Sequence, residues 1–354
     1  MAVPNPAQEI ANEISSLQSQ VSRLQDQVRL SNVRDAVEDL QTNINGMSQR
    51  VANLRQGGYA FDKELESQAA DFAKQWGALQ STLNAQINSQ SSTLQAAIRP
   101  LEAQLTQLAT VANNPTAARP ILTKANATAK QLEDQASAAE KMITGMYDTL
   151  RNKVSEVNQH LTELEGMIKN LAEASFKLLP TESGIMAVKA VWYQGEKERK
   201  EDPDGILYLT DQRLIFEQKE EIATKKVLFI ATEKKKVQEL EWEIPVALIE
   251  NVTTSKQGML KNEDHIHLTC ASNAPHQRLD LHIWQPCDAW VRLINQAKNK
   301  DFDKTRAIAI DQAELAKAKA APSQCPNCGG NINQVVMRGM DNIKCEYCGF
   351  VIRL

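Results

Sequence analysis

The stretch Gly205–Phe216, with the sequence GILYLTDQRLIF, decides the fold of the central part of the chain. Its two halves are rich in β-branched, aliphatic and aromatic residues, which favour strands. Asp211, a residue common in turns, and Gln212 separate the halves. Two short apolar runs joined by a polar pair predict a strand, a turn and a second strand.

Runs of the same type lie on both sides of this stretch, bounded by turn residues. After them, residues 286–300 place several apolar side chains, Trp290 among them, on one helical face. Residues 181–300 are therefore predicted to form a small β-domain of seven or eight strands with a closing helix. The other predicted strands are 185–194, 226–232, 237–244, 252–255, 265–270 and 278–284.

This plan resembles the pleckstrin-homology (PH) superfold, in which a helix plugs the open end of a bent sheet, and its residues are most similar to the GRAM branch. The resemblance rests on Gly205–Phe216, on Ile244-Pro245 and Leu248-Ile249 before the next strand, and on Trp290 in the last helix. Residues 220–243 depart from the family pattern, because they are longer than expected and include a further hairpin around Lys234-Lys235-Lys236. The resemblance implies recruitment to a membrane or to a protein, since such domains bind phosphoinositide headgroups, other lipids or peptides.

Basic loop residues are the candidates for ligand binding. Phosphate is held best by several converging donors, which would come from the loops at the open end of the barrel. Acidic residues lie beside each basic run, so a merely solvated loop is the alternative, and a protein partner fits as well as an anionic lipid surface. The candidate lipid- or partner-binding residues are Lys197, Arg199, Lys200, Lys225, Lys226, Lys234, Lys235 and Lys236.

Three histidines fall in neighbouring predicted strands. His265 and His267 lie two residues apart and so share one face of a strand, and His282 lies in an adjacent strand. A metal site here is the less favoured interpretation, because no carboxylate or cysteine spacing completes it. Cys270 and Cys287 are expected to be buried small side chains rather than a redox pair.

Residues 1–178 have the periodicity of long helices. Apolar residues at intervals of four and three run from Ile10 to Val28 and resume, two residues out of register, from Val33 to Leu54. The shift predicts a local disturbance near residues 30–36. A long-helix coiled coil and a three-helix antiparallel bundle both fit this pattern, and either would serve as a spacer or as an element of self-association.

Glycine, asparagine and proline residues that start or end helices divide this helical region. Gly57-Gly58 predicts the end of the first helix, and Asn113-Asn114-Pro115 predicts the end of the second. Pro120 is expected to open the third helix. Phe61, Phe72 and Trp76 lie on the seam and are expected to be core residues.

Two cysteine pairs at the C-terminus carry the most specific chemical signal. Each is a C-x2-C-G knuckle, and 16 residues separate them. The glycine lets the backbone turn tightly, so that both thiolates face one tetrahedral ion. Residues 325–354 closely resemble a zinc ribbon, and we predict one structural zinc ion, with a rubredoxin-like iron site as the alternative. The predicted zinc ligands are Cys325, Cys328, Cys345 and Cys348.

Composition narrows the function classes. The 354-residue chain has a formal net charge of −4 and no strongly basic segment, which disfavours nucleic-acid binding as the main activity. No apolar run approaches the roughly 20 residues of a membrane span, and the N-terminus lacks the features of a signal peptide. We therefore expect a cytoplasmic protein that is peripheral at the membrane if its ligand is a lipid.

The predicted fold class is multidomain α+β. It comprises a long-helix coiled coil or three-helix bundle over 1–178, a PH-like β-barrel with a C-terminal helix over 181–300, an Ala/Lys-rich linker over 301–324 and a zinc ribbon over 325–354.

The predicted function is that of a non-enzymatic adaptor or scaffold. No Gly-rich phosphate loop, nucleophile elbow or His-Glu metal helix occurs in the sequence, so an enzyme is disfavoured. The adaptor would recruit partners or a membrane surface through its PH-like module and assemble through its coil. The alternatives are a zinc-ribbon nucleic-acid-binding or transcription-associated factor with a dimerising coiled coil, and a purely structural scaffold.

Overall fold

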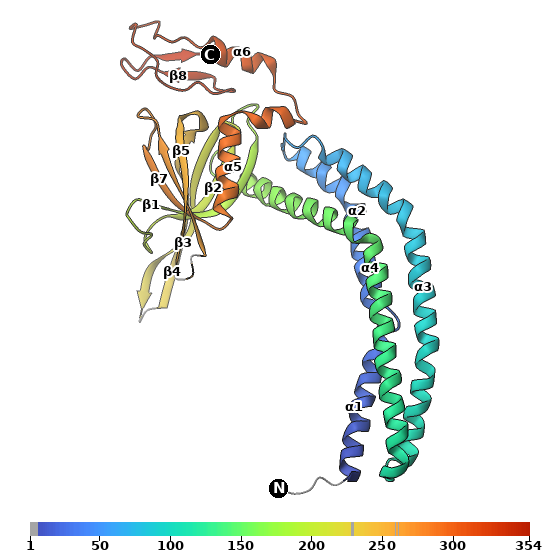
Figure 1. The fold of residues 1–354 in the computed structure, drawn as a ribbon. Helices are drawn as coiled ribbons and strands as arrows, with labels where there is room; N and C mark the ends of the chain where they lie inside the picture. Colours follow the sequence, from blue (N-terminus) through green and yellow to red (C-terminus); the bar gives the residue numbers. More distant parts are fainter. Residues whose placement is uncertain (1–5, 228–229, 259, 261) are drawn as a thin grey trace. The chain divides into compact units, whose positions relative to one another are not determined.

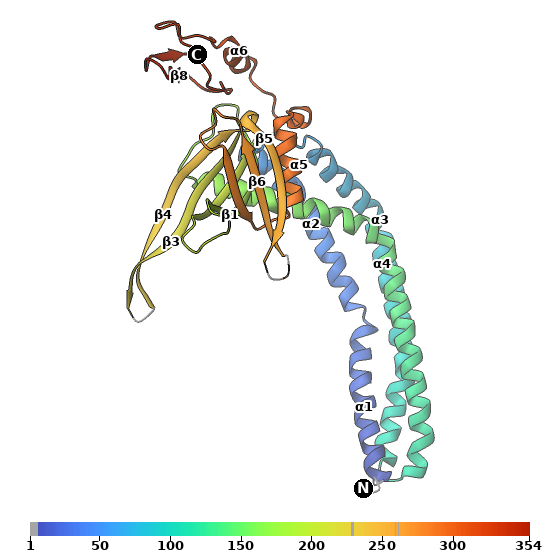
Figure 2. The same ribbon diagram turned by 60° about the vertical axis from the view of Figure 1, so that its left-hand side comes forward.

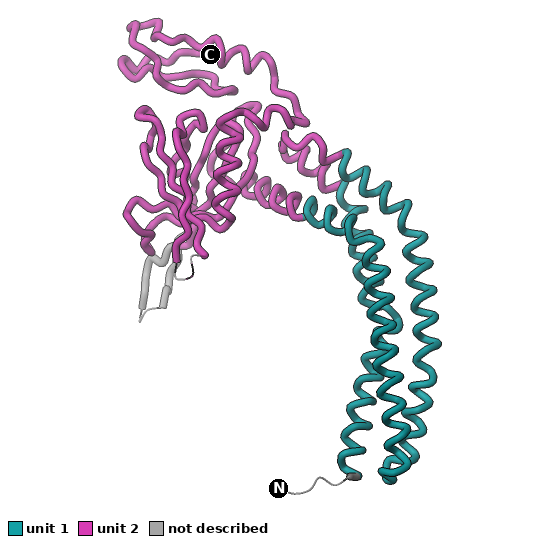
Figure 3. Tube along the Cα trace, in the orientation of Figure 1, with its two compact units in different colours: residues 1–48, 67–158 teal, residues 49–66, 159–354 magenta. Residues whose placement is uncertain are grey.

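The computed structural model describes residues 6–227, 230–258, 260 and 262–354, and the side chains of residues 6 and 222–235 lie outside this description. The chain forms two compact units, which Figure 3 colours separately. Unit 1 comprises residues 1–48 and 67–158, and unit 2 comprises residues 49–66 and 159–354.

Unit 1 is a bundle of long helices (Figure 1). Within it, α1 and α2 follow one another alongside α3 and α4. Gln25 Nε2 of α1 donates to Glu102 of α3 at 2.8 Å, and Arg119 of α4 donates to Glu13 of α1 at 2.7 Å. The seam from Ile10 onward is buried inside this bundle. The four helices are α1 (Pro6–Gln27), α2 (Ser31–Gln56), α3 (Leu65–Val111) and α4 (Pro115–Glu173), with the end of α2, the start of α3 and the end of α4 in unit 2.

Two predicted interruptions of the first helical run are present. Helix α1 ends at Gln27 and α2 begins at Ser31, and Leu30 between them has a left-handed φ of 55°. This break agrees with the register shift in the seam. Helix α2 ends just before the glycine pair, where Gly58 has a φ of 89° that a side chain would disfavour. Among the described residues, no helix combines the length and hydropathy needed to span a bilayer.

Helix α4 begins at Pro115, so the prediction that Pro120 opens this helix was wrong. Asn114 Oδ1 accepts a hydrogen bond from the backbone N–H of Ala117 at 3.2 Å and caps the helix. Proline at the first helical position needs no partner for a backbone N–H. Pro120 therefore lies inside a helix whose start signal came five residues earlier.

Unit 2 contains a seven-stranded antiparallel sheet with the order β4-β3-β2-β1-β7-β6-β5. Helix α5 (Cys287–Lys298) packs against β5 and β6 (Figure 2). Its Trp290 side chain is completely buried. This strand order and closing helix agree with the predicted PH-like fold class. The strands are β1 (Gly184–Tyr193), β2 (Asp204–Thr210), β3 (Arg213–Val227), β4 (Ile230–Pro245), β5 (Ile249–Gln257), β6 (Glu263–Cys270) and β7 (Arg278–Ile283), with a 3₁₀ turn, η1 (Val246–Leu248), before β5.

Residues 205–216 form nearly all of β2, a turn and most of the buried part of β3. Gly205 in β2 is opposite Gln218 in β3. A Cβ atom on Gly205 would lie 2.0 Å from the carbonyl oxygen of Glu217, so only glycine fits this close approach. Trp192, Phe216 and Trp242 form the aromatic core of this side of the sheet, with ring centroids 5.8–6.3 Å apart.

The further hairpin predicted around Lys234-Lys235-Lys236 is not present among the described residues. Strands β3 and β4 pair from Arg213 opposite Pro245 to Val227 opposite Ile230, with three irregularities in register, so Lys234-Lys235-Lys236 lies within β4 rather than in a loop. Dense charge hides the strand pattern here, because the strands place residues of opposite charge across from each other, as in Glu221 opposite Lys236. The side chains of four candidates, Lys225, Lys226, Lys234 and Lys235, lie outside the described residues.

The predicted linker contains a 3₁₀ helix, η2 (Asp301–Thr305), and a short helix, α6 (Gln312–Ala320). The ribbon that follows has one two-stranded sheet, in which β8 (Asn342–Lys344) pairs with β9 (Val351–Arg353). Its core is small and contains Ile343, Ile352 and two cysteines. A core of this size is too small to stabilise a fold without a further constraint.

Candidate functional site

The two cysteine knuckles of the ribbon have the same local geometry. Gly329 and Gly349 each have a φ of 74°, and their N–H groups donate to the carbonyls of Cys325 and Cys345 at 2.8 and 2.9 Å. This turn directs both thiols of each knuckle to one point. All four Sγ atoms lie within 4.8 Å of one another, and the Cys325–Cys348 and Cys328–Cys345 pairs are 3.7 Å apart.

These distances fit a tetrahedral metal ion. A zinc–thiolate bond of about 2.3 Å implies sulfur–sulfur edges of about 3.8 Å. The observed 3.7 Å is close to that value. The four cysteines could therefore hold one ion with sulfur ligands only, and such a set leaves no open position for a reacting water molecule.

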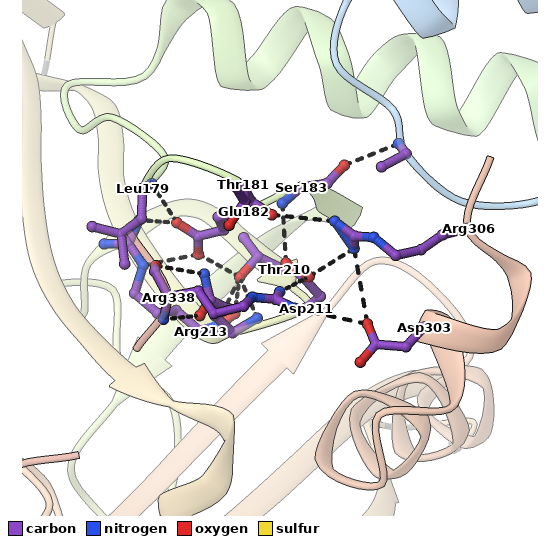
Figure 4. Close-up of polar contacts among 12 residues, drawn as sticks. Leu179, Thr181, Glu182, Ser183, Thr210, Asp211, Arg213, Asp303, Arg306 and Arg338 are labelled. Carbon is purple, nitrogen blue, oxygen red and sulfur yellow. Dashed lines mark hydrogen bonds and ion pairs between the residues drawn. The ribbon is translucent and has the colours of Figure 1, made fainter. Parts of the chain in front are cut away.

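A buried carboxylate joins the ribbon and the linker to the β-domain (Figure 4). Asp211, in the β2–β3 turn, accepts a hydrogen bond from Arg306 Nη1 of the linker at 2.9 Å and another from Arg338 Nη2 of the ribbon. Its second oxygen accepts the backbone N–H of Ser183 at 3.0 Å. The side chains of Asp211, Arg306 and Arg338 are 4%, 7% and 11% exposed.

Burial dominates the electrostatics of this ion-pair group. It raises the pKa of Asp211 above the ordinary value, although the Ser183 N–H and the two guanidinium groups act in the opposite direction. Burial also lowers the pKa of Arg306. Removing such charges from water cancels much of their attraction, so the group specifies where the segments meet more than it adds stability. Losing one member, however, would leave uncompensated buried charge.

Backbone contacts reinforce the same junction. Gln212 Oε1 accepts the N–H of Arg338 at 2.7 Å, and Gln212 Nε2 donates to the carbonyl of Arg338 at 3.1 Å. Gly339 follows with a φ of 79°, and a Cβ atom there would lie 2.3 Å from the Pro180 carbonyl oxygen. The ribbon therefore approaches the segment that leads into β1 at a distance that only glycine permits.

A second buried ion pair holds the two residues that flank the β2–β3 turn. Arg213 binds Glu182 through two nitrogens, at 2.9 and 2.5 Å, and also contacts Glu243. Thr210 donates to the same Glu182 carboxylate at 2.6 Å. Glu182 also accepts the N–H of Leu179 at 2.7 Å, so the chain entering β1 and the β2–β3 turn share one polar network (Figure 4).

The β1–β2 loop presents three of the predicted basic candidates. Lys197, Arg199 and Lys200 are all exposed. Two neighbouring acids have contacts within the loop or with the sheet: Asp202 accepts the Arg199 N–H at 2.5 Å, and Glu198 pairs with His282 at 2.7 Å. Of the β4 candidates, Lys236 is exposed.

The histidines lie on adjacent strands as predicted, and a carboxylate joins them. His265 in β6 is directly opposite His282 in β7. Their rings are stacked with centroids 4.6 Å apart, and Glu198 approaches from the β1–β2 loop. Burial and the two neighbouring histidines lower the pKa of His265 to about 4, so its ring is uncharged at neutral pH. No local pattern marks Glu198, which is separated from His282 by 84 residues.

Cys270 and Cys287 are buried free thiols, as expected. Phe61, Phe72 and Trp76 are buried, which confirms them as core residues.

Unit 2 thus combines a PH-like β-domain with a four-cysteine ribbon. Comparison with protein-family models gives no match, and comparison with curated proteins gives none either. The chain is similar to the solved structure of the Vps36 N-terminal PH domain at 16% identity and a TM-score of 0.24, with 35% of this chain and 85% of that chain covered.

Fragments with DH and PH domains are also similar. The DH/PH fragment of PDZRHOGEF in complex with human RhoA gives 11% identity and a TM-score of 0.26, with 84% of this chain and 96% of that chain covered. The DH/PH domains of p115-RhoGEF give 13% identity and a TM-score of 0.23, with 84% of this chain and 95% of that chain covered. Similarity at this level carries no functional argument.

Proposed function

We propose that this chain is a non-enzymatic adaptor in which a PH-like module of the GRAM type and a zinc-stabilised ribbon form one recognition unit. The observation that carries this proposal is the shared carboxylate of Asp211. It joins the β2–β3 turn, the linker and the ribbon through buried charge. Recognition surfaces on the ribbon and on the β-domain of this cytoplasmic protein would then face the same membrane surface or the same partner protein.

One zinc ion per chain is part of this proposal. With four thiolates as ligands, the ion would cross-link the two knuckles and supply the stability that the small ribbon core lacks. Metal analysis of the purified chain should find about one zinc ion for each four-cysteine ribbon, in addition to any ion bound elsewhere. A folded ribbon without metal, or iron in its place, would contradict this assignment.

The basic β1–β2 loop is the proposed contact with an anionic surface. Lys197, Arg199 and Lys200 are exposed, whereas Glu198 and Asp202 are engaged in contacts of their own. Glu196 and Glu201 of the same loop are also exposed, and we propose that the three basic side chains, rather than the net charge of the loop, make the contact. Each basic residue near an anionic membrane contributes about 1 kcal/mol, so losing three such charges should reduce vesicle binding by about two orders of magnitude, and reversing them by more.

A matched charge reversal separates this proposal from the nucleic-acid alternative. The test variant is K197E/R199E/K200E, and the control, with the same net charge, is K319E/K344E/R353E on α6 and the ribbon. We expect flotation with phosphatidylserine-containing vesicles to be lost in the first variant only. Absent flotation of the wild type, together with a gel shift on mixed DNA and RNA that the second variant loses, would favour the nucleic-acid factor.

The contacts of Arg338 favour the adaptor over that alternative. Only three basic residues follow Cys325, namely Arg338, Lys344 and Arg353. Arg338 is largely buried against Asp211, so little positive charge remains on the ribbon to meet phosphate. Self-association through the helical region stays a prediction, which light scattering of the full chain would test.

A further inference from the structure

A second group of metal-ligand side chains lies in the β-domain, away from the cysteine ribbon. It combines His265 of β6, His282 of β7 and Glu198 of the β1–β2 loop. One ring nitrogen of each histidine and one carboxylate oxygen of Glu198 lie within 4.8 Å of one another. The closest pair is Glu198 Oε2 and His282 Nδ1, which are 2.7 Å apart.

The buried ring of His265 has one nitrogen that its described neighbours leave without a hydrogen bond. Its side chain is 2% exposed. Its Nδ1 lies 3.1 Å from the Tyr193 hydroxyl, whereas its buried Nε2 has no hydrogen-bond partner among the described residues. The Glu263 carboxylate is 3.9 Å from this nitrogen, beyond hydrogen-bonding distance. A buried polar atom without a partner costs free energy, and a bound cation would satisfy it.

We propose that Glu198, His265 and His282 form a binding site for a divalent transition-metal ion. Two imidazoles and one carboxylate are a ligand set that such ions take, whereas calcium and magnesium prefer oxygen ligands alone. Three protein ligands leave at least one coordination position open. This site therefore differs in kind from a closed set of four thiolates.

Ion binding requires a small change in ring orientation. The His265 and His282 rings are nearly parallel, with an angle of 15° between their planes, and lone pairs in parallel planes do not converge on one ion. The torsion that turns a histidine ring has a broad energy profile. His282 is the less buried of the two, at 12% side-chain exposure, so we expect its ring to be the one that rotates. This rotation would break its stacking on Trp284.

His267 provides a matched control within the same strand. Both of its ring nitrogens already have partners, with Nδ1 2.6 Å from Asp280 and Nε2 2.8 Å from the Ser255 hydroxyl. It lies outside the ligand group although it is only two residues from His265. Replacing it therefore changes the histidine content of this face without removing a proposed ligand.

Cobalt(II) titration of the full, metal-free chain tests the site, because thiolate ligands give a charge-transfer absorption that histidine and carboxylate ligands lack. We expect the wild type to bind two equivalents, one of them without this band. E198Q and H282Q should lose the second equivalent, with an affinity drop larger than the roughly 10- to 100-fold caused by removing a supporting residue. H267Q should keep both equivalents.

The same titration reports metal binding by the ribbon and by the proposed site separately. The variant C345S/C348S should lose the thiolate band and keep the other equivalent. The proposal is overturned if the folded wild type shows no equivalent besides the thiolate one. It is equally overturned if E198Q and H282Q, with unchanged circular dichroism, retain that equivalent, or if H267Q loses it.

Discussion

Replacement of Asp211 by Asn removes the charge that Arg306 and Arg338 share while preserving the shape of the side chain. Both guanidinium groups are nearly buried, at 7% and 11% exposure. Removing one partner of a buried ion pair costs about 3–5 kcal/mol, because the remaining charge is left uncompensated. Arg306 keeps a hydrogen bond to the Thr181 carbonyl at 3.1 Å in D211N. We therefore expect the free-energy cost of D211N to lie at the lower end of this range, about 3 kcal/mol.

The loss should appear first as opening of the ribbon junction. A decrease of about 3 kcal/mol in the opening free energy raises the open population about a hundredfold, and cleavage by a protease follows that population when opening is fast. Limited trypsin digestion should therefore cut the linker between residues 307 and 324 about a hundred times faster in D211N. Urea unfolding followed by tryptophan fluorescence reports the stability of the β-domain in the same variant.

Asp303 supplies the matched control. Its carboxylate is 36% exposed and lies 4.0 and 3.9 Å from the same two arginines. Exposed pairs of this kind contribute less than about 1 kcal/mol, so D303N should be cut at nearly the wild-type rate. Equal cleavage rates for D211N and D303N would refute the reasoning that burial makes the shared carboxylate decisive.

Two further predictions concern unit 2. The hydrogen bond to Asp62 raises the pKa of His160. Burial alone would raise the pKa of Asp62, but its hydrogen bonds with His160 and Tyr59 outweigh burial and lower it. H160Q should therefore destabilise the fold most between pH 3.8 and 6.5, the ordinary pKa values of Asp and His, and progressively less at higher pH, as urea unfolding at a series of pH values would show. An equal loss at about pH 9 would contradict this sign. G339A should cost more than the roughly 1–2 kcal/mol of a left-handed backbone, because its Cβ also meets the Pro180 carbonyl. The control G58A has a φ of 89° and open space, so equal thermal stability losses would argue against that contact.

The sequence was sufficient to predict the elements whose signals are local. Alternation and turn residues identify β2 and β3, and the two knuckles identify the four cysteines that the structure brings together. The extension of β3 and β4 was predicted with its turn in the wrong place, around Lys234-Lys235-Lys236, because paired charges rather than apolar alternation accompany it. Asp211 lies 95 and 127 residues from its arginine partners, and no pattern along a chain marks such distant pairs.

The length of β4 has a consequence for solubility. β4 and β5 stand at the two ends of the strand order, so each leaves one row of backbone hydrogen-bonding groups without a neighbouring strand in the described sheet. Long, flat edge strands invite pairing between molecules, and lysines are a common protection against it. Lys234-Lys235-Lys236 occupies such an edge. Lys236, which is exposed, would therefore help to keep separate copies of the sheet from joining edge to edge, a role that requires no ligand at all.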